Sequence, residues 1–136
     1  MPTQAAAQRR EEERERFNAN LVECPGHQLL ATLSDKWVTL VISALADGPL
    51  RYNELSRIVA GASQKMLTQT LRKLERDGFV TRTITPTVPV RVDYELTALG
   101  SDLVPLQRGI KAWAEEHIDV VTTARAAFDG RAQAAG

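Results

Sequence analysis

The stretch that decides the fold runs from Ser63 to Gly78 and reads SQKMLTQTLRKLERDG. Ser63 is suited to cap the start of a helix, because its hydroxyl can accept a hydrogen bond from a free backbone N–H of the first turn. Gly78 is suited to end that helix just beyond Asp77. One side of the intervening segment is apolar or small at helical spacing and comprises Met66, Leu67, Thr70, Leu71 and Leu74. The stretch therefore predicts an amphipathic helix that packs this side against the rest of a domain.

The other side of the same helix is polar and basic. It carries Gln64, Lys65, Thr68, Gln69, Arg72, Lys73 and Arg76. Amides and hydroxyls suit the edges of DNA bases, and cations suit phosphates. Six basic residues stand against two acidic ones between positions 63 and 91, although the whole chain carries 17 of each sign. Positive charge is thus concentrated locally, but a solvated helix face without any ligand would have a similar composition.

Two shorter helices are predicted before this segment. Ser34 or Asp35 caps the first, which buries Trp37, Leu40, Val41, Ala44 and Leu45, and Asp47-Gly48-Pro49 ends it. The second lies near residues 52–59 and buries Leu55, Ile58 and Val59. Together with the helix at 63–77 they form a helix-turn-helix arrangement, in which the last helix of the pair enters the major groove of DNA.

Two strands, at residues 79–84 and 90–96, are predicted to follow as a hairpin. The second alternates cleanly, with Val90, Val92, Tyr94 and Leu96 on one face. Pro86 and Pro89 place residues 85–89 in the connecting loop, since proline cannot pair centrally in a sheet. Arg82 and Arg91 lie near the hairpin ends, where a cation can reach the minor groove or a flanking phosphate. Their alternative role is cross-strand pairing with Asp93 or Glu95.

These elements predict a mainly α fold with a small β-hairpin (α+β), namely a winged helix-turn-helix domain that dimerises through its terminal helices. The candidate DNA-binding residues divide into two groups. The group assigned to the major groove consists of Gln64, Lys65, Thr68, Gln69 and Arg72, and Ser63 precedes it at the helix start. The group assigned to phosphates or the minor groove consists of Lys73, Arg76, Arg82 and Arg91.

The two ends of the chain differ from its middle. Residues 1–20 are a charged helical arm or solvated tail with Phe17 as their one sizeable apolar anchor, and residues 122–136 are predicted to be a flexible tail. The winged domain with its last helix occupies residues 21–121. That last helix begins near Thr97, and Pro105 is expected to kink or split it.

The last helix carries an apolar seam whose spacings alternate between four and three residues. The seam consists of Leu99, Leu103, Leu106, Ile110, Trp113, His117 and Val120. The predicted dimer interface therefore consists of Phe17, Leu103, Leu106, Ile110 and Trp113. The alternative is that the seam packs only within its own domain.

Several segments together resemble the HxlR family of bacterial winged-helix regulators, relatives of the MarR type. They are Cys24-Pro25, Lys36-Trp37, LRYNEL at 50–55, the stretch at 63–78, and VPVRVDYELT at 88–97. The resemblance covers about residues 24–117. It implies a homodimeric, one-domain transcriptional regulator that binds double-stranded DNA at a roughly palindromic operator. Ser34-Asp35 and Val90 depart from the family pattern, but both lie outside the predicted reading helix.

Cys24 is the one cysteine of the chain and directly precedes Pro25, a favoured first residue of a helix. A sulfur at a helix N-terminus is favoured as thiolate. In members of the resembled family a cysteine at this place senses electrophiles or oxidants, so the resemblance implies that Cys24 is a thiol sensor. The alternative is an unreactive, partly buried cysteine. A small-molecule effector at the dimer seam is the other candidate signal, but it has no sequence signature.

The remaining features narrow the class of protein. At 136 residues, with 43% hydrophobic and 25% charged side chains, the chain has the size of one ordinary domain rather than of a multi-domain enzyme. No common catalytic motif or phosphate loop is present, and Cys24, His27 and His117 are too few to indicate a metal site, so no enzyme, cofactor or metal is expected. No secretory signal or membrane span is apparent, which predicts a cytoplasmic protein. The alternative function is a winged-helix module for protein association, without sequence-specific DNA binding.

Overall fold

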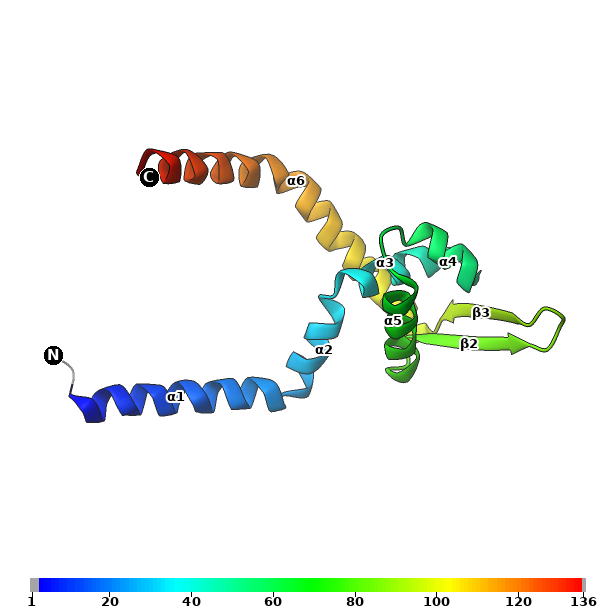
Figure 1. Cartoon of the computed structure of the whole chain (residues 1–136), viewed down its shortest axis with the longest axis horizontal. Helices are drawn as coiled ribbons and strands as arrows, with labels where there is room; N and C mark the ends of the chain where they lie inside the picture. The colour runs from blue at the N-terminus through cyan, green and yellow to red at the C-terminus, as the bar shows by residue number, and fades with distance from the viewer. Residues whose placement is uncertain (1–2, 136) are drawn as a thin grey trace.

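A computed structural model describes residues 3–135 of the chain, except for the side chains of residues 21–23 (Figure 1). Six helices and three strands lie within this range. In chain order they are α1 (Gln4–Glu23), α2 (Pro25–Leu33), α3 (Lys36–Leu45), β1 (Leu50–Arg51), α4 (Tyr52–Ile58), α5 (Gln64–Arg76), β2 (Val80–Thr85), β3 (Arg91–Leu96) and α6 (Ala98–Ala135). The predicted fold class, a mainly α winged helix-turn-helix with a small β-hairpin, is confirmed, and the hairpin is part of a three-stranded sheet.

Helix α3 lies at the centre of the core, against α5, α6 and β3. Asp35 caps it, because its Oδ1 accepts hydrogen bonds from the N–H groups of Trp37 at 2.8 Å and Val38 at 3.2 Å. The buried side chains are Val38, Val41, Ile42 and Leu45. The predicted face was therefore partly wrong: Leu40 is exposed, and Trp37 and Ala44 are only half-buried. Because several elements pack against α3, its buried face also includes Val38 and Ile42. The prediction left these two residues out, because it assumed one apolar stripe along the helix.

Helices α4 and α5 form the predicted pair. The side chains of Leu55 in α4 and of Val59 at its end are buried in the core, as predicted. Ile58, which was also predicted to be buried, is exposed. In α5 the side chains of Leu67, Thr70, Leu71 and Leu74 are buried as predicted, but that of Met66 is exposed, because it lies at the margin of the apolar stripe. Ser63 Oγ accepts a hydrogen bond from the Met66 N–H at 3.1 Å, which confirms the predicted cap.

The sheet has three strands in the order β1-β3-β2, all antiparallel. β2 and β3 are the predicted hairpin, with Val80 opposite Leu96 and Thr85 opposite Arg91. β1, which pairs Leu50 with Tyr94, was not predicted, since a strand of two residues carries no alternation to detect. Val90 was predicted to begin the second strand, but it lies in the loop and is exposed.

The start of α6 is joined to the end of α5 by a close polar contact. Thr97 Oγ1 donates a hydrogen bond to the Gly78 carbonyl oxygen at 2.6 Å and accepts one from the Gly100 N–H at 3.1 Å. The Thr97 N–H donates to the Phe79 carbonyl oxygen at 3.0 Å. A Cβ at Gly100 would collide with that same Phe79 oxygen. The absence of a side chain at Gly100 therefore lets α6 approach the first residue after the α5 turn.

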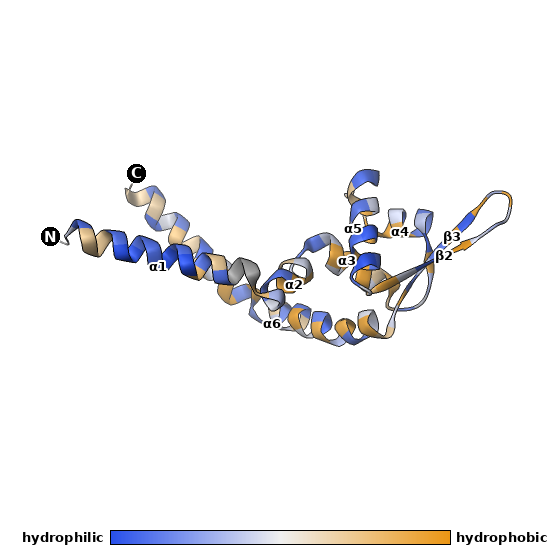
Figure 2. Cartoon of the chain, turned by 90° about the horizontal axis from the view of Figure 1, so that it is seen from below, coloured by the Kyte–Doolittle hydropathy of each residue, from blue (hydrophilic) through white to orange (hydrophobic). Residues whose placement is uncertain are grey.

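Beyond this contact α6 is continuous to Ala135, so Pro105 does not split it, and the predicted frayed tail from residue 122 is helical. The alanine-rich composition of the last turns explains the helix, because alanine has the highest helix propensity. The end of α6 and the charged helix α1 leave the core on the same side of the molecule as two separate arms (Figures 1 and 2). Phe17 lies on the α1 arm and is exposed.

We expect Gly100→Ala to lower the free energy of unfolding by about 1–3 kcal/mol, because the added methyl group must displace backbone rather than a flexible side chain. Urea denaturation measures this change. Gly130→Ala, on the same helix with open space around its Cβ position, is the matched control and should be neutral or stabilising by up to about 1 kcal/mol. Equal effects of the two substitutions would contradict the close approach.

Candidate nucleic-acid interface

A stripe of four exposed side chains runs along α5 opposite its buried face. Lys65, Gln69, Arg72 and Arg76 follow one another at spacings of four, three and four residues, which places them on one side of the helix. α5 and the β2–β3 hairpin, or wing, lie at the end of the molecule opposite the two arms (Figure 1). We call these four residues the α5 stripe. It combines one amide with three cations on a surface that no other described part of the chain covers.

Contacts with α4 fix the N-terminal end of α5. The Tyr52 hydroxyl donates to the Gln64 carbonyl oxygen at 3.4 Å and lies 3.4 Å from Thr68 Oγ1. Gln64 is exposed, whereas Thr68 is half-buried. The Thr68 side chain, which was predicted to face the major groove, is therefore already in contact with Tyr52.

Lys73 lies on a different flank of α5 from the α5 stripe. With Arg76 it lines a depression of about 440 Å³ whose other wall is α2, including Pro25 and Leu29. Both cations are exposed. The C-terminal end of α5 thus presents its positive charge toward the side of the molecule where α2 begins.

Both arginines predicted for the wing are ion-paired. Arg82 Nε lies 3.6 Å from Glu75 Oε2 of α5, and Arg91 Nε donates to both carboxylate oxygens of Asp93 at 2.9 and 3.2 Å. The expected alternative was pairing across strands, but Asp93 is on the same strand as Arg91 and Glu75 is on the helix. The Arg82 pair therefore connects the wing to α5, and both arginine side chains stay nearly half exposed.

Tyr94 lies beneath the junction between α5 and the wing. It lines a small pocket of about 160 Å³ together with Arg72, Glu75 and Arg82. Burial raises the pKa of the Tyr94 phenol above its usual value, and Arg82 opposes this shift. The phenol is therefore neutral at physiological pH and does not compete with the neighbouring carboxylate for the arginines.

Two polar residues near the wing were missed by the sequence reasoning. Arg51 of β1 and Asn53 of α4 line a depression of about 280 Å³ with Arg91. The Arg51 N–H donates to Glu54 Oε1 at 3.2 Å, which closes the start of α4. Only the pairing of β1 with β3 brings Arg51 beside the wing, so its sequence position gave no sign of this placement.

Cys24 is exposed at the junction between α1 and α2, where it occupies the N-cap position of α2 and precedes Pro25. Its side chain makes no capping hydrogen bond. Within residues 3–135, outside the undescribed side chains, no group of three or more potential metal-ligating side chains occurs. None of the described helices is both long enough and apolar enough to cross a membrane.

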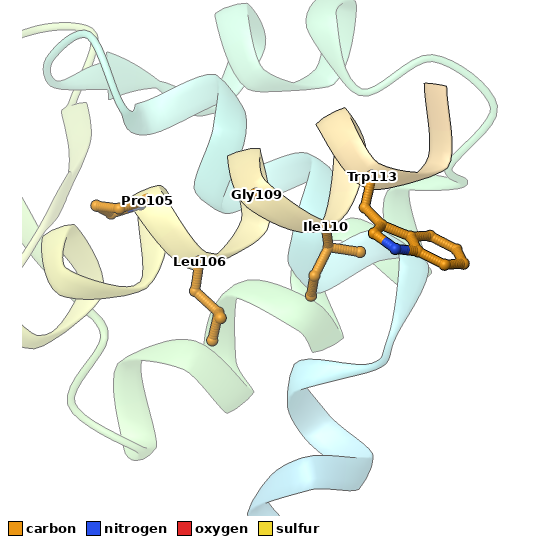
Figure 3. A pocket seen from close by; sticks show the side chains of 5 residues that line it. All are labelled: Pro105, Leu106, Gly109, Ile110 and Trp113. Carbon is orange, nitrogen blue, oxygen red and sulfur yellow. The ribbon is translucent and has the colours of Figure 1, made fainter. Parts of the chain in front are cut away.

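The predicted interface residues fall into two groups. Leu103 is buried in the core of its own domain, so the expectation that it faces a partner needs correction. Leu106, Ile110 and Trp113 are exposed, project from the same side of α6 and line a shallow pocket of about 400 Å³ (Figure 3). The Trp113 ring stacks on His117 at 4.3 Å between centroids. We call Leu106, Ile110 and Trp113 the α6 patch.

Comparison with known proteins gives matches that agree with one another. The family described as HxlR-like helix-turn-helix matches residues 32–122. The uncharacterized HTH-type transcriptional regulator YtfH of Escherichia coli is 36% identical over 103 residues, which are 76% of this chain and 82% of YtfH. A solved structure of ytfH from Salmonella typhimurium, at 37% identity, covers 76% of this chain and 92% of its own with a TM-score of 0.69. The redox regulator HypR in its reduced form is 37% identical, covers 74% of this chain and 99% of its own, and has a TM-score of 0.67.

Proposed function

We propose that this chain, which belongs to the HxlR-like helix-turn-helix family and is a transcriptional regulator of that type, acts as a homodimer that reads a palindromic operator with α5. The α5 stripe carries this proposal. Its amide and cations are the groups that bind base edges and phosphates, and its opposite face is anchored in the core, so the side chains are presented by a rigid element.

Different side chains have different tasks in this proposal. Gln64, Lys65, Gln69 and Arg72 contact base edges in the major groove, with Thr68 at their margin. Lys73, Arg76, Arg82 and Arg91 contact phosphates, and Ser63 lies at the α5 N-terminus, where free N–H groups favour an anion. A phosphate reaching Arg82 or Arg91 would have to replace Glu75 or Asp93 as its partner.

Dimerisation would supply the second reading helix, about 34–36 Å from the first, one turn of DNA away. The α6 patch supports this arrangement, because three large apolar side chains on one helix face remain exposed in the single chain. Phe17 of the α1 arm is exposed as well and is available to a partner.

Cys24 is proposed as a thiol switch of this regulator. Its exposure and its place where α1 meets α2 support the proposal, since modification there would alter the angle between these helices. The similarity to HypR, a redox regulator, supports it further. With one cysteine per chain, a disulfide can form only with the partner chain or with a small thiol.

DNA binding is tested with two variants that should behave differently. Gln69→Ala should lose about 1–3 kcal/mol of binding free energy on operator DNA but not on random DNA, because it removes contacts to a base edge. Arg76→Ala should weaken operator and random DNA alike and lower the salt dependence by about one phosphate contact. Fluorescence anisotropy at several salt concentrations, on an operator selected from random DNA, measures both effects.

Arg125→Ala, on the distal part of α6, is the charge-matched control and should leave DNA affinity unchanged. Equal losses on both DNAs for Gln69→Ala would reject base reading by Gln69. Weak DNA binding with little salt dependence would instead favour the protein-docking alternative.

The dimer is tested by Trp113→Asp. A carboxylate at the centre of an apolar interface should raise the dimer dissociation constant roughly a hundredfold, or about 3 kcal/mol. Sedimentation equilibrium measures this. Ile58→Asp introduces the same charge at an exposed apolar position on α4 and should leave the association unchanged. A Trp113→Asp variant that associates as the parent does would contradict the α6 patch as the interface.

The thiol switch is tested by oxidation with diamide. Two thiols give one disulfide, and diamide takes up the two electrons and two protons. DNA affinity of the parent protein should fall by about 5- to 150-fold and return with dithiothreitol, whereas Cys24→Ser should not respond. Anisotropy follows the affinity, and a non-reducing gel identifies the linked species. The same diamide response in both proteins would exclude Cys24.

A further inference from the structure

A depression of about 280 Å³ lies between the start of α4 and the wing, outside the α5 stripe. The sheet brings its parts together, because Arg51 of β1 pairs with Asp93 of β3. The polar lining of the depression consists of Arg51, Asn53 and Arg91, and its apolar wall of Pro89, Val90 and Val92. Two cations and an amide therefore lie beside an apolar surface, and no acidic side chain lines the depression.

Both arginines have N–H groups available to a ligand. Arg51 is exposed, and the ion pairs within the described residues involve other basic side chains, so its guanidinium has no acidic partner among them. Arg91 donates to Asp93 through Nε, and its two terminal NH₂ groups make no hydrogen bond within the part of the chain that the structure describes. The depression thus offers one unpaired positive charge and further hydrogen-bond donors.

Two carboxylates belong to the same segments, and both are already engaged. Glu54 Oε1 accepts a hydrogen bond from the Arg51 backbone N–H at 3.2 Å, which holds it at the start of α4. Both carboxylate oxygens of Asp93 accept from Arg91 Nε, at 2.9 and 3.2 Å. Neither carboxylate pairs with the Arg51 guanidinium, so the depression is suited to an anion from outside the chain.

An anion with an apolar part fits this lining better than a small inorganic ion does. Guanidinium groups bind phosphate oxygens through several N–H donors, and the Asn53 amide can add another donor. Val90 is 63% exposed and, with Pro89, presents apolar surface beside these donors. A phosphodiester with its deoxyribose matches both surfaces, because it carries charged oxygen acceptors next to the C–H groups of a sugar ring.

Tyr52 connects the depression to α5. It lines the depression, and its hydroxyl lies 3.4 Å from both the Gln64 carbonyl oxygen and Thr68 Oγ1. In helix-turn-helix proteins the first helix of the pair crosses the DNA backbone while the second enters the major groove. Because α4 is the first helix of this pair, the depression at its start is expected to meet a backbone phosphate when α5 is docked.

We propose that this depression binds one phosphodiester and its deoxyribose, on a strand that borders the groove occupied by α5. Arg51, Asn53 and Arg91 hold the phosphate, and Pro89 and Val90 contact the sugar. A phosphate carries no sequence information, so this contact fixes the position of α5 along the groove rather than the base that it reads. The inference rests on the proposed function and adds Arg51 and Asn53 to the DNA-binding residues.

The test replaces one phosphate at a time by an uncharged methylphosphonate in an operator selected from random DNA. Fluorescence anisotropy measures the affinity of the full-length parent and of Arg51→Gln for each duplex. We expect one position in each half-site at which the replacement weakens the parent roughly tenfold but leaves Arg51→Gln unchanged, because the variant has already lost that contact. On unmodified operator and random DNA alike, Arg51→Gln should weaken binding roughly tenfold and lower the salt dependence by about one phosphate contact, each counted per protomer.

Arg57→Gln is the matched control, since Arg57 is an exposed cation in the last turn of the same helix α4. It should keep the affinity, the salt dependence and the sensitivity to each methylphosphonate that the parent shows. Arg51→Gln retains the backbone N–H that bonds to Glu54, so its urea denaturation should match that of the parent. Val90→Ser leaves both arginines in place and should weaken binding to both DNAs about threefold with unchanged salt dependence.

A scan without any position at which the parent and Arg51→Gln differ would overturn the proposal. A loss by Arg51→Gln on the operator alone would also overturn it, because Arg51 would then read a base. Parent-like affinity of Val90→Ser would overturn the contact with the sugar. The Gln69 and Arg76 variants test α5 separately. If they behave as expected and Arg51→Gln does not, this inference alone fails, whereas a parent that does not bind DNA contradicts both proposals.

Discussion

Burial of one face of α5 against α3 is the contact on which the rest of the structure depends. Leu67, Leu71 and Leu74 are almost fully buried in the same core as Val41 and Ile42. Because apolar burial contributes roughly 25 cal/mol per Å² and the polar face of α5 gains nothing from the core, the helix has one stable rotation about its axis. That rotation points the α5 stripe outward and turns Glu75 toward the wing.

The sequence predicted those parts of the fold whose periodicity is uninterrupted. The α5 helix, its Ser63 cap and the β2–β3 hairpin follow from local patterns, and all three agree with the structure. The errors arose where tertiary contacts decide. α3 is covered on several sides, so its buried face is wider than one stripe, and β1 exists only because β3 offers it a partner. Pro105 does not break α6, which is held at its start by Thr97 and Gly100.

The candidate site was predictable to the extent that it consists of one helix face. Spacing alone places Lys65, Gln69, Arg72 and Arg76 on a common side. The engagement of Thr68 by Tyr52 and the position of Arg51 beside the wing depend on residues far away in sequence.

The pairing of Arg82 with Glu75 has a thermodynamic consequence for any anion that approaches the wing. The free protein already supplies its own counter-anion there, so an incoming phosphate exchanges one negative partner for another. The net gain is the difference between two ion pairs, and an exposed pair is worth about 0–1 kcal/mol. A free phosphate ion therefore gains little binding free energy at Arg82. A phosphate that a docked duplex holds in the right position gains more, so this arginine favours anions by their position rather than by their charge alone.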